Sequence, residues 1–140
     1  MNKTKLFDQP FISADWALFI LRVALGILIF MNHGIEKLFT FNKMLEIFPD
    51  PMGIGKFPSL IFALISDGIC SVLILLGLFT RISALLLCIN LLTALVLFHN
   101  FQITDVHGEL VAIYLVITII VLFYGPGKVS IDTFLKTRFR

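Results

Sequence analysis

Two ionisable side chains, Arg22 and Asp67, stand inside long apolar runs of the sequence. A charge near the middle of a membrane-spanning helix costs about 2.5–3.5 kcal/mol even on the mildest insertion scale, so such residues usually face the interior of a helix bundle and find partners there. At about 1.5 Å per residue, Arg22 lies roughly 12 Å from the N-terminal end of its run and Asp67 roughly 18 Å from the C-terminal end of its own. Asp67 is thus near the middle of the membrane, where an ionisable residue is a candidate for a functional site.

Further polar groups gather around the level of Asp67 and beyond it. On a helical wheel of about 100° per residue, polar residues of the first run share one stripe. The stripe consists of Arg22, Gly26, His33, Glu36 and Lys37. Polar groups of the later runs that fall near the same outer level are His99, His107 and Glu109, with Asn90 somewhat deeper. This set predicts a polar face that points into a bundle.

Three interpretations of these residues stay open. They could line a ligand pocket that opens outward with Asp67 as its floor. They could instead be interhelical hydrogen-bonding partners that only hold the bundle together. A metal site built from histidines and Glu109 is the least favoured, because no HExxH-type spacing places two ligands on one helix face. We therefore assign no metal, and no catalytic residue.

The composition limits the class of protein. Of 140 residues, 59% are hydrophobic and only 14% are charged, with a net charge of +2, whereas a soluble domain has about 45–50% apolar and about 25% charged residues. Fifteen phenylalanines and so small a net charge also exclude a disordered chain and a nucleic-acid-binding module. The lipid bilayer is the expected solvent.

Four segments approach the length of about 20 apolar residues that a membrane-spanning helix needs. The segments are 14–39, 57–79, 82–99 and 106–124. None shows the apolar/polar alternation of a membrane β-barrel strand. The predicted fold class is therefore all-α, a transmembrane four-helix bundle in which residues 1–140 form a single membrane domain. Only Thr80 and Arg81 separate the second and third segments, which predicts a tight hairpin.

The distribution of Lys and Arg predicts the orientation, because positive residues near span ends stay in the cytoplasm. One side collects Lys3, Lys5, Arg81, Lys128, Lys136, Arg138 and Arg140, and the other collects Lys37, Lys43 and Lys56. We expect both termini to be cytoplasmic, in a protein of the bacterial cytoplasmic membrane.

Two further segments are amphipathic and are expected to lie along the membrane surface. One is 40–48, before the helix-breaking sequence Pro49-Asp50-Pro51. The other is 130–140, a basic segment with Ser130 as its N-cap, expected near anionic lipid. Between it and the fourth span, Gly125-Pro126-Gly127 is expected to end the helix sharply.

Three stretches carry a family likeness, in order, between Leu21 and Asp132. They are Leu21-Arg22 with 33–39 (HGIEKLF), Asp67 with 77–81 (GLFTR), and 125–132 (GPGKVSID). In these stretches the chain resembles the DoxX family of small four-helix membrane proteins. His99 and Glu109 also match positions that are often His and Glu in that family, whereas Asp67 stands where the family typically has Glu.

The resemblance implies a redox setting. The family takes its name from a likeness to the small quinone-linked subunit of a thiosulfate oxidoreductase, and relatives act as membrane partners of redox enzymes in oxidative-stress responses. The sequence itself has no CxxCH haem motif, nucleotide-binding glycine loop or CxxC pair. A redox role would therefore need a bound quinone or a partner protein.

We expect a bundle that binds a small amphipathic ligand, a quinone or a lipid, as a membrane subunit of a redox or stress-response complex. The predicted ligand-binding residues are Arg22, His33, Glu36, Asp67, Asn90, His99 and Glu109, with His33 or His99 as proton exchangers. The alternative is a non-enzymatic membrane scaffold or assembly factor whose buried charges serve packing alone. Gly26 and Gly77 permit a homodimer. A transporter is disfavoured, because no inverted repeat is visible.

Overall fold

A computed structural model describes residues 10–51 and 53–138, and every regular element in that part of the chain is helical. The first span consists of α1 (Ala14–Ile29), the π-helical segment η2 (Phe30–Gly34) and α2 (Ile35–Phe39). The second consists of α4 (Lys56–Leu64), the π-helical segment η3 (Ile65–Cys70) and α5 (Ser71–Leu76). The third consists of α6 (Thr80–Thr93) and the π-helical segment η4 (Ala94–Phe98), and the fourth is α7 (Val106–Tyr124). Four helices are long and apolar enough to cross a membrane, so the predicted all-α, four-span bundle is confirmed.

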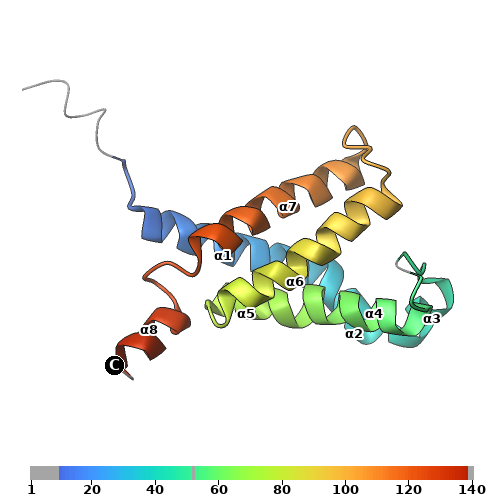
Figure 1. Cartoon of the computed structure of the whole chain (residues 1–140), viewed down its shortest axis with the longest axis horizontal. Coiled ribbons are helices and arrows are strands. Elements are labelled where there is room, and N and C mark those ends of the chain that lie inside the picture. Colours follow the sequence, from blue (N-terminus) through green and yellow to red (C-terminus); the bar gives the residue numbers. More distant parts are fainter. Residues whose placement is uncertain (1–9, 52, 139–140) are drawn as a thin grey trace, which may run out of the picture.

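The four spans form a closed ring of neighbours. α1 packs against α5 and α7, and α6 packs against the same two helices. In Figure 1, α3 (Phe41–Ile47) and the loop between the third and fourth spans lie at one end, while α8 (Ile131–Arg138) and the start of α1 lie at the other. The core between the spans is aliphatic, with Leu25, Ile29, Leu87, Leu91 and Val121 among its buried residues.

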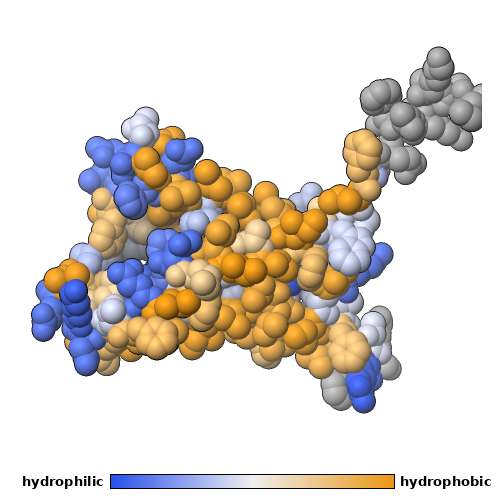
Figure 2. All heavy atoms as spheres, turned by 180° about the vertical axis from the view of Figure 1, so that it is seen from behind, coloured by the Kyte–Doolittle hydropathy of each residue, from blue (hydrophilic) through white to orange (hydrophobic). Residues whose placement is uncertain are grey.

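The outside of the bundle is an apolar belt. Figure 2 shows orange, hydrophobic side chains around the middle of the molecule and hydrophilic ones gathered toward its two ends. Each span contributes large exposed side chains to the belt, among them Ile20, Ile69, Leu92 and Val116. A continuous apolar surface of this extent is expected of a bundle that faces lipid. The helices can be surrounded by lipid because their backbone polar groups are hydrogen-bonded within each helix.

The turn between the second and third spans differs from the sequence expectation. Instead of ending at Phe79 and resuming at Ile82, the spans end at Leu76 and resume at Thr80. The chain reverses through two left-handed residues, Gly77 at φ 69° and Phe79 at φ 47°. Glycine adopts this conformation at little cost, whereas phenylalanine does so only when its surroundings hold it.

α8 supplies the contacts that hold this turn. The Asp132 carboxylate accepts hydrogen bonds from the backbone N–H groups of Phe79 and Thr80, at 2.8 and 3.0 Å, and the Asp132 N–H donates to the Gly77 carbonyl at 2.8 Å. The Ser130 hydroxyl accepts from the Thr133 N–H at 3.2 Å, which confirms Ser130 as the N-cap of α8. The fourth span ends at Tyr124, before Gly125 at φ 82°.

The predicted surface segments correspond to α3 and α8 as far as the chain is described. Residues 139–140 of the segment 130–140, and Lys3 and Lys5 of the charge count, lie outside the described residues. The cytoplasmic orientation of the termini stays a prediction.

Two glycines allow the first and second spans to approach closely. A Cβ at Gly26 would lie 2.7 Å from the Ser71 carbonyl oxygen, and one at Gly34 would lie 2.7 Å from the Asp67 carbonyl oxygen. These distances are too short for any real side chain, and the nearest atoms belong to the backbone. The absence of a side chain at both positions therefore sets the distance between the spans.

A Gly26→Val variant should be destabilised by about 1–3 kcal/mol or more, because the added atoms force α1 away from α5. Thermal unfolding of the protein in detergent measures the change. Ala24→Val is the matched control, since Ala24 is exposed on the same helix. Equal melting temperatures for the two variants would contradict the close approach at Gly26.

Candidate functional site

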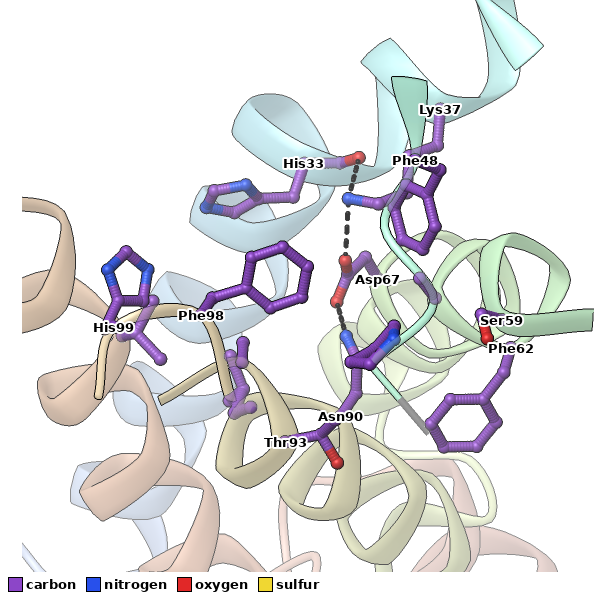
Figure 3. Close-up of a pocket in the computed structure, with 15 residues that line it drawn as sticks. His33, Lys37, Phe48, Ser59, Phe62, Asp67, Asn90, Thr93, Phe98 and His99 are labelled. Atoms are coloured by element: carbon purple, nitrogen blue, oxygen red, sulfur yellow. Dashed lines mark hydrogen bonds and ion pairs between the residues drawn. The ribbon is translucent and has the colours of Figure 1, made fainter. Parts of the chain in front are cut away.

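A cavity of about 280 Å³ opens between the spans, at the level of the three π-helical segments. Figure 3 shows the side chains that line it. The polar ones are His33, Lys37, Ser59, Asp67, Asn90, Thr93 and His99. The apolar ones are Phe48, Pro51, Phe62, Ala63, Leu91, Ala94, Phe98 and Val111. The cavity thus combines a polar side with aromatic and aliphatic walls.

Asp67 is the centre of a polar network that joins three spans. Its Oδ2 forms an ion pair with Lys37 Nζ at 2.9 Å, and its Oδ1 accepts a hydrogen bond from Asn90 Nδ2 at 2.8 Å. Lys37 Nζ also donates to the His33 carbonyl at 3.2 Å. These contacts appear as the dashed lines in Figure 3. Both carboxylate oxygens of Asp67, whose charge is costly to place inside a membrane, therefore have a close partner.

The ion pair is almost fully buried. The side chains of Lys37 and Asp67 are only 10% and 8% exposed. Away from water an ion pair is worth far more than the 0–1 kcal/mol typical of the protein surface, but burying both charges costs several kcal/mol each. Losing one partner leaves an uncompensated charge, which makes each residue dependent on the other.

The π-helical segments place the lining residues. η2 carries His33, η3 carries Asp67, and η4 carries Ala94 and Phe98. A π-helical turn replaces i→i+4 bonding with i→i+5 bonding and is frequently found at functional sites. Three such turns, in three spans, each contribute residues to the cavity wall.

The same turns explain why one predicted site residue lies elsewhere. The wheel of about 100° per residue assumes a regular α-helix, but η2 advances the chain by a smaller angle per residue. Beyond Phe30 the stripe therefore no longer holds: Lys37 is buried in the cavity wall, whereas Glu36 is exposed and does not line it.

Arg22 lies away from the cavity, near the opposite end of the bundle. Its Nη1 donates to the carbonyls of Ile74 and Leu75 at 3.0 and 3.5 Å, and its Nη2 donates to the carbonyl of Val129. Its guanidinium also lies 5.8 Å from the centre of the Phe19 ring. Arg22 is 1% exposed and stabilises the end of α5, so it does not share the site of Asp67.

His99, His107 and Glu109, which the sequence placed at one level, do not all reach the cavity. His99 lines the cavity, but Glu109 and His107 are exposed on α7 and do not. Within residues 10–51 and 53–138, no three His, Cys, Asp or Glu side chains come close enough together to hold a metal ion. His33 packs edge-to-face on Tyr114, with ring centres 6.3 Å apart.

The segment between α3 and α4 covers the cavity through Phe48 and Pro51. Asp50 holds it in place: its carboxylate accepts hydrogen bonds from the N–H groups of Ile54 and Gly55, at 3.0 and 2.8 Å, and from the Ser59 hydroxyl at 3.0 Å. These bonds, that from Gly55 above all, keep the pKa of Asp50 below its ordinary value of 3.8.

Sequence reasoning put Lys37 on the polar stripe without assigning it to the site, and it missed the aromatic residues Phe48, Phe62 and Phe98. Lys37 lies four residues after His33, so its spacing alone marked it as a neighbour on one helix face. The phenylalanines carry no such signal, because fifteen are spread through the chain.

The DoxX family model matches residues 17–100. The chain belongs to the DoxX family. The matched segment contains the first span from residue 17 onward, the second and third spans, and all the polar residues that line the cavity. Together with the four apolar helices, family membership identifies an integral membrane protein. No curated protein and no solved structure matches the chain.

Lys37→Met and Asp67→Asn should each lower stability by about 3–5 kcal/mol, because each leaves an unpaired buried charge. The double variant should lose much less than the sum of the two, because no charge is left. Unfolding of the four proteins in detergent gives this coupling. Strict additivity would contradict a direct ion pair.

Asp50→Asn should be less stable than the wild type at neutral pH. A carboxyl group whose pKa is lower in the folded than in the unfolded state stabilises the folded state at every pH at which it is ionised. The contribution is complete above pH 3.8 and is lost as the pH falls through the lowered pKa. The melting temperatures of the wild type and Asp50→Asn, measured from neutral pH down to pH 3 or below, should therefore converge at the acid end. Glu46→Gln on α3 is the control, and the same convergence there would contradict the assignment.

Proposed function

We propose that this DoxX-family protein binds a small amphipathic molecule, a quinone or a lipid, in the cavity around Asp67. The observation that carries this proposal is a cavity between the spans whose wall combines a polar network with the rings of Phe48, Phe62 and Phe98. Ligand sites are typically apolar concavities with a few well-placed polar groups, which is the composition found here.

The size of the cavity suits the head of such a molecule. Ligand pockets usually measure about 300–1,000 Å³, and this one is near the lower limit. A single ring or a compact head fits, with its tail in the surrounding lipid. Within residues 10–51 and 53–138 the imidazoles of His33 and His99 form no hydrogen bond, and the carbonyl oxygen of Asn90 accepts none, so these groups are free to bond a head.

The proposed setting is a membrane subunit of a redox or stress-response complex. A bound quinone would supply the electron chemistry that the chain's own side chains lack. Asn90 would orient its head, and the imidazoles of His33 and His99 would exchange protons with it.

A scaffold without a ligand is the second candidate. The observation in its favour is that Lys37, Asp67 and Asn90 satisfy one another, as residues that only hold helices together would. In that case the cavity is a packing gap, and nothing specific copurifies with the protein.

Filling the cavity distinguishes the two candidates. Ala94→Trp places a large ring in it, and Val111→Phe narrows it from α7. Leu97→Trp is the control, because Leu97 is 51% exposed on the same π-helical segment as Ala94 and does not line the cavity.

Native mass spectrometry and solvent extraction of the purified proteins provide the readout. We expect a stoichiometric quinone or neutral lipid with the wild type and Leu97→Trp, and its loss by about tenfold or more in the two filling variants. The same occupancy in all four proteins, or no bound molecule in any, would favour the scaffold.

A further inference from the structure

We infer that the cavity accepts amphiphiles with an uncharged head and rejects those with a charged head. This inference rests on the proposed function and names the class of ligand that the same site would take. It follows from how the two charges in the wall are arranged.

The wall is electrically neutral as a unit. Lys37 and Asp67 are the only Asp, Glu, Lys or Arg among the residues that line the cavity in the described chain, and their charged atoms are 2.9 Å apart. Each charge is thus cancelled by its neighbour rather than presented to the cavity. The acidic residue nearest in sequence to Lys37, Glu36, is exposed outside the wall.

A charged head would have no counter-ion left. A carboxylate or phosphate would have to compete with Asp67 for Lys37, and an ammonium would have to compete with Lys37 for Asp67. Either exchange leaves one buried charge unpaired, which is among the most costly changes in an apolar setting. The ion pair therefore excludes charged heads of both signs.

An uncharged head meets none of these penalties. A ligand hydroxyl can donate to the free side-chain carbonyl of Asn90, and a ligand carbonyl can accept from an imidazole N–H of His33 or His99, while the ion pair stays intact. Quinones, quinols and neutral lipids with an alcohol head belong to this class. Fatty acids, phospholipids and long-chain amines do not.

The test uses dodecanol, dodecanoate and dodecylamine, which share one tail and differ in head charge. Each is titrated at neutral pH into the detergent-purified protein, and native mass spectrometry reports occupancy. For the wild type we expect dodecanol to bind at least about tenfold more tightly than either charged probe. Leu97→Trp should show the same preference.

Variants of the ion pair should change the preference in opposite directions. Asp67→Asn leaves the cation of Lys37 and should favour dodecanoate, whereas Lys37→Met leaves the anion of Asp67 and should favour dodecylamine. The double variant is neutral again and should return to dodecanol, which keeps the test valid if a single variant unfolds.

The outcomes separate this inference from the proposed function. Equal or tighter binding of a charged probe by the wild type, or an unchanged preference in folded single variants, overturns the selection by charge and leaves a ligand site in place. No occupancy by any of the three probes, in the wild type or the double variant, overturns the binding function and this inference together.

Discussion

The buried ion pair between Lys37 and Asp67 is the interaction on which the half of the bundle that holds the cavity depends. In a membrane interior water cannot solvate either charge, so each must find its partner within the protein. The pair joins the first and second spans, and Asn90 adds the third by bonding to the same carboxylate. One carboxylate thus fixes three helices relative to one another and sets the polarity of the cavity they enclose.

The other buried charge, that of Arg22, is stabilised by backbone carbonyls and, within the described residues, not by a counter-ion in contact with it. Arg22 donates to the carbonyls of Ile74 and Leu75 in the last turn of α5. Carbonyls there lack the i+4 N–H partner that they would have in the middle of a helix. Its third bond goes to Val129, just before α8, whose Asp132 holds the turn of the second and third spans. The opposite end of the bundle is therefore closed by backbone carbonyls and a C-terminal helix, not by an ion pair.

Cavity and network arise from local departures from the α-helix. Three spans carry a π-helical segment, and residues of all three segments line the cavity. Gly34 lets η2 lie against the backbone of Asp67, which brings the first span close enough for Lys37 to reach the carboxylate. Close backbone approach and irregular helical turns thus place the charges, within an otherwise regular bundle.

The sequence by itself determined the four-span, all-α architecture, because long apolar runs and few charges leave a membrane bundle as the only stable solution. It also marked Asp67 and Asn90 by their depth, Ser130 as a cap, and His33 and His99 as polar residues toward the same end of the bundle. Only the tertiary structure decided that Asp67 pairs with Lys37 and that Arg22 and Glu36 lie elsewhere. The physical reason is that the position of a residue along an apolar run fixes how deep it lies in the membrane. The direction in which its side chain points depends on the rotation of the helix about its axis, which π-helical turns and helix packing set.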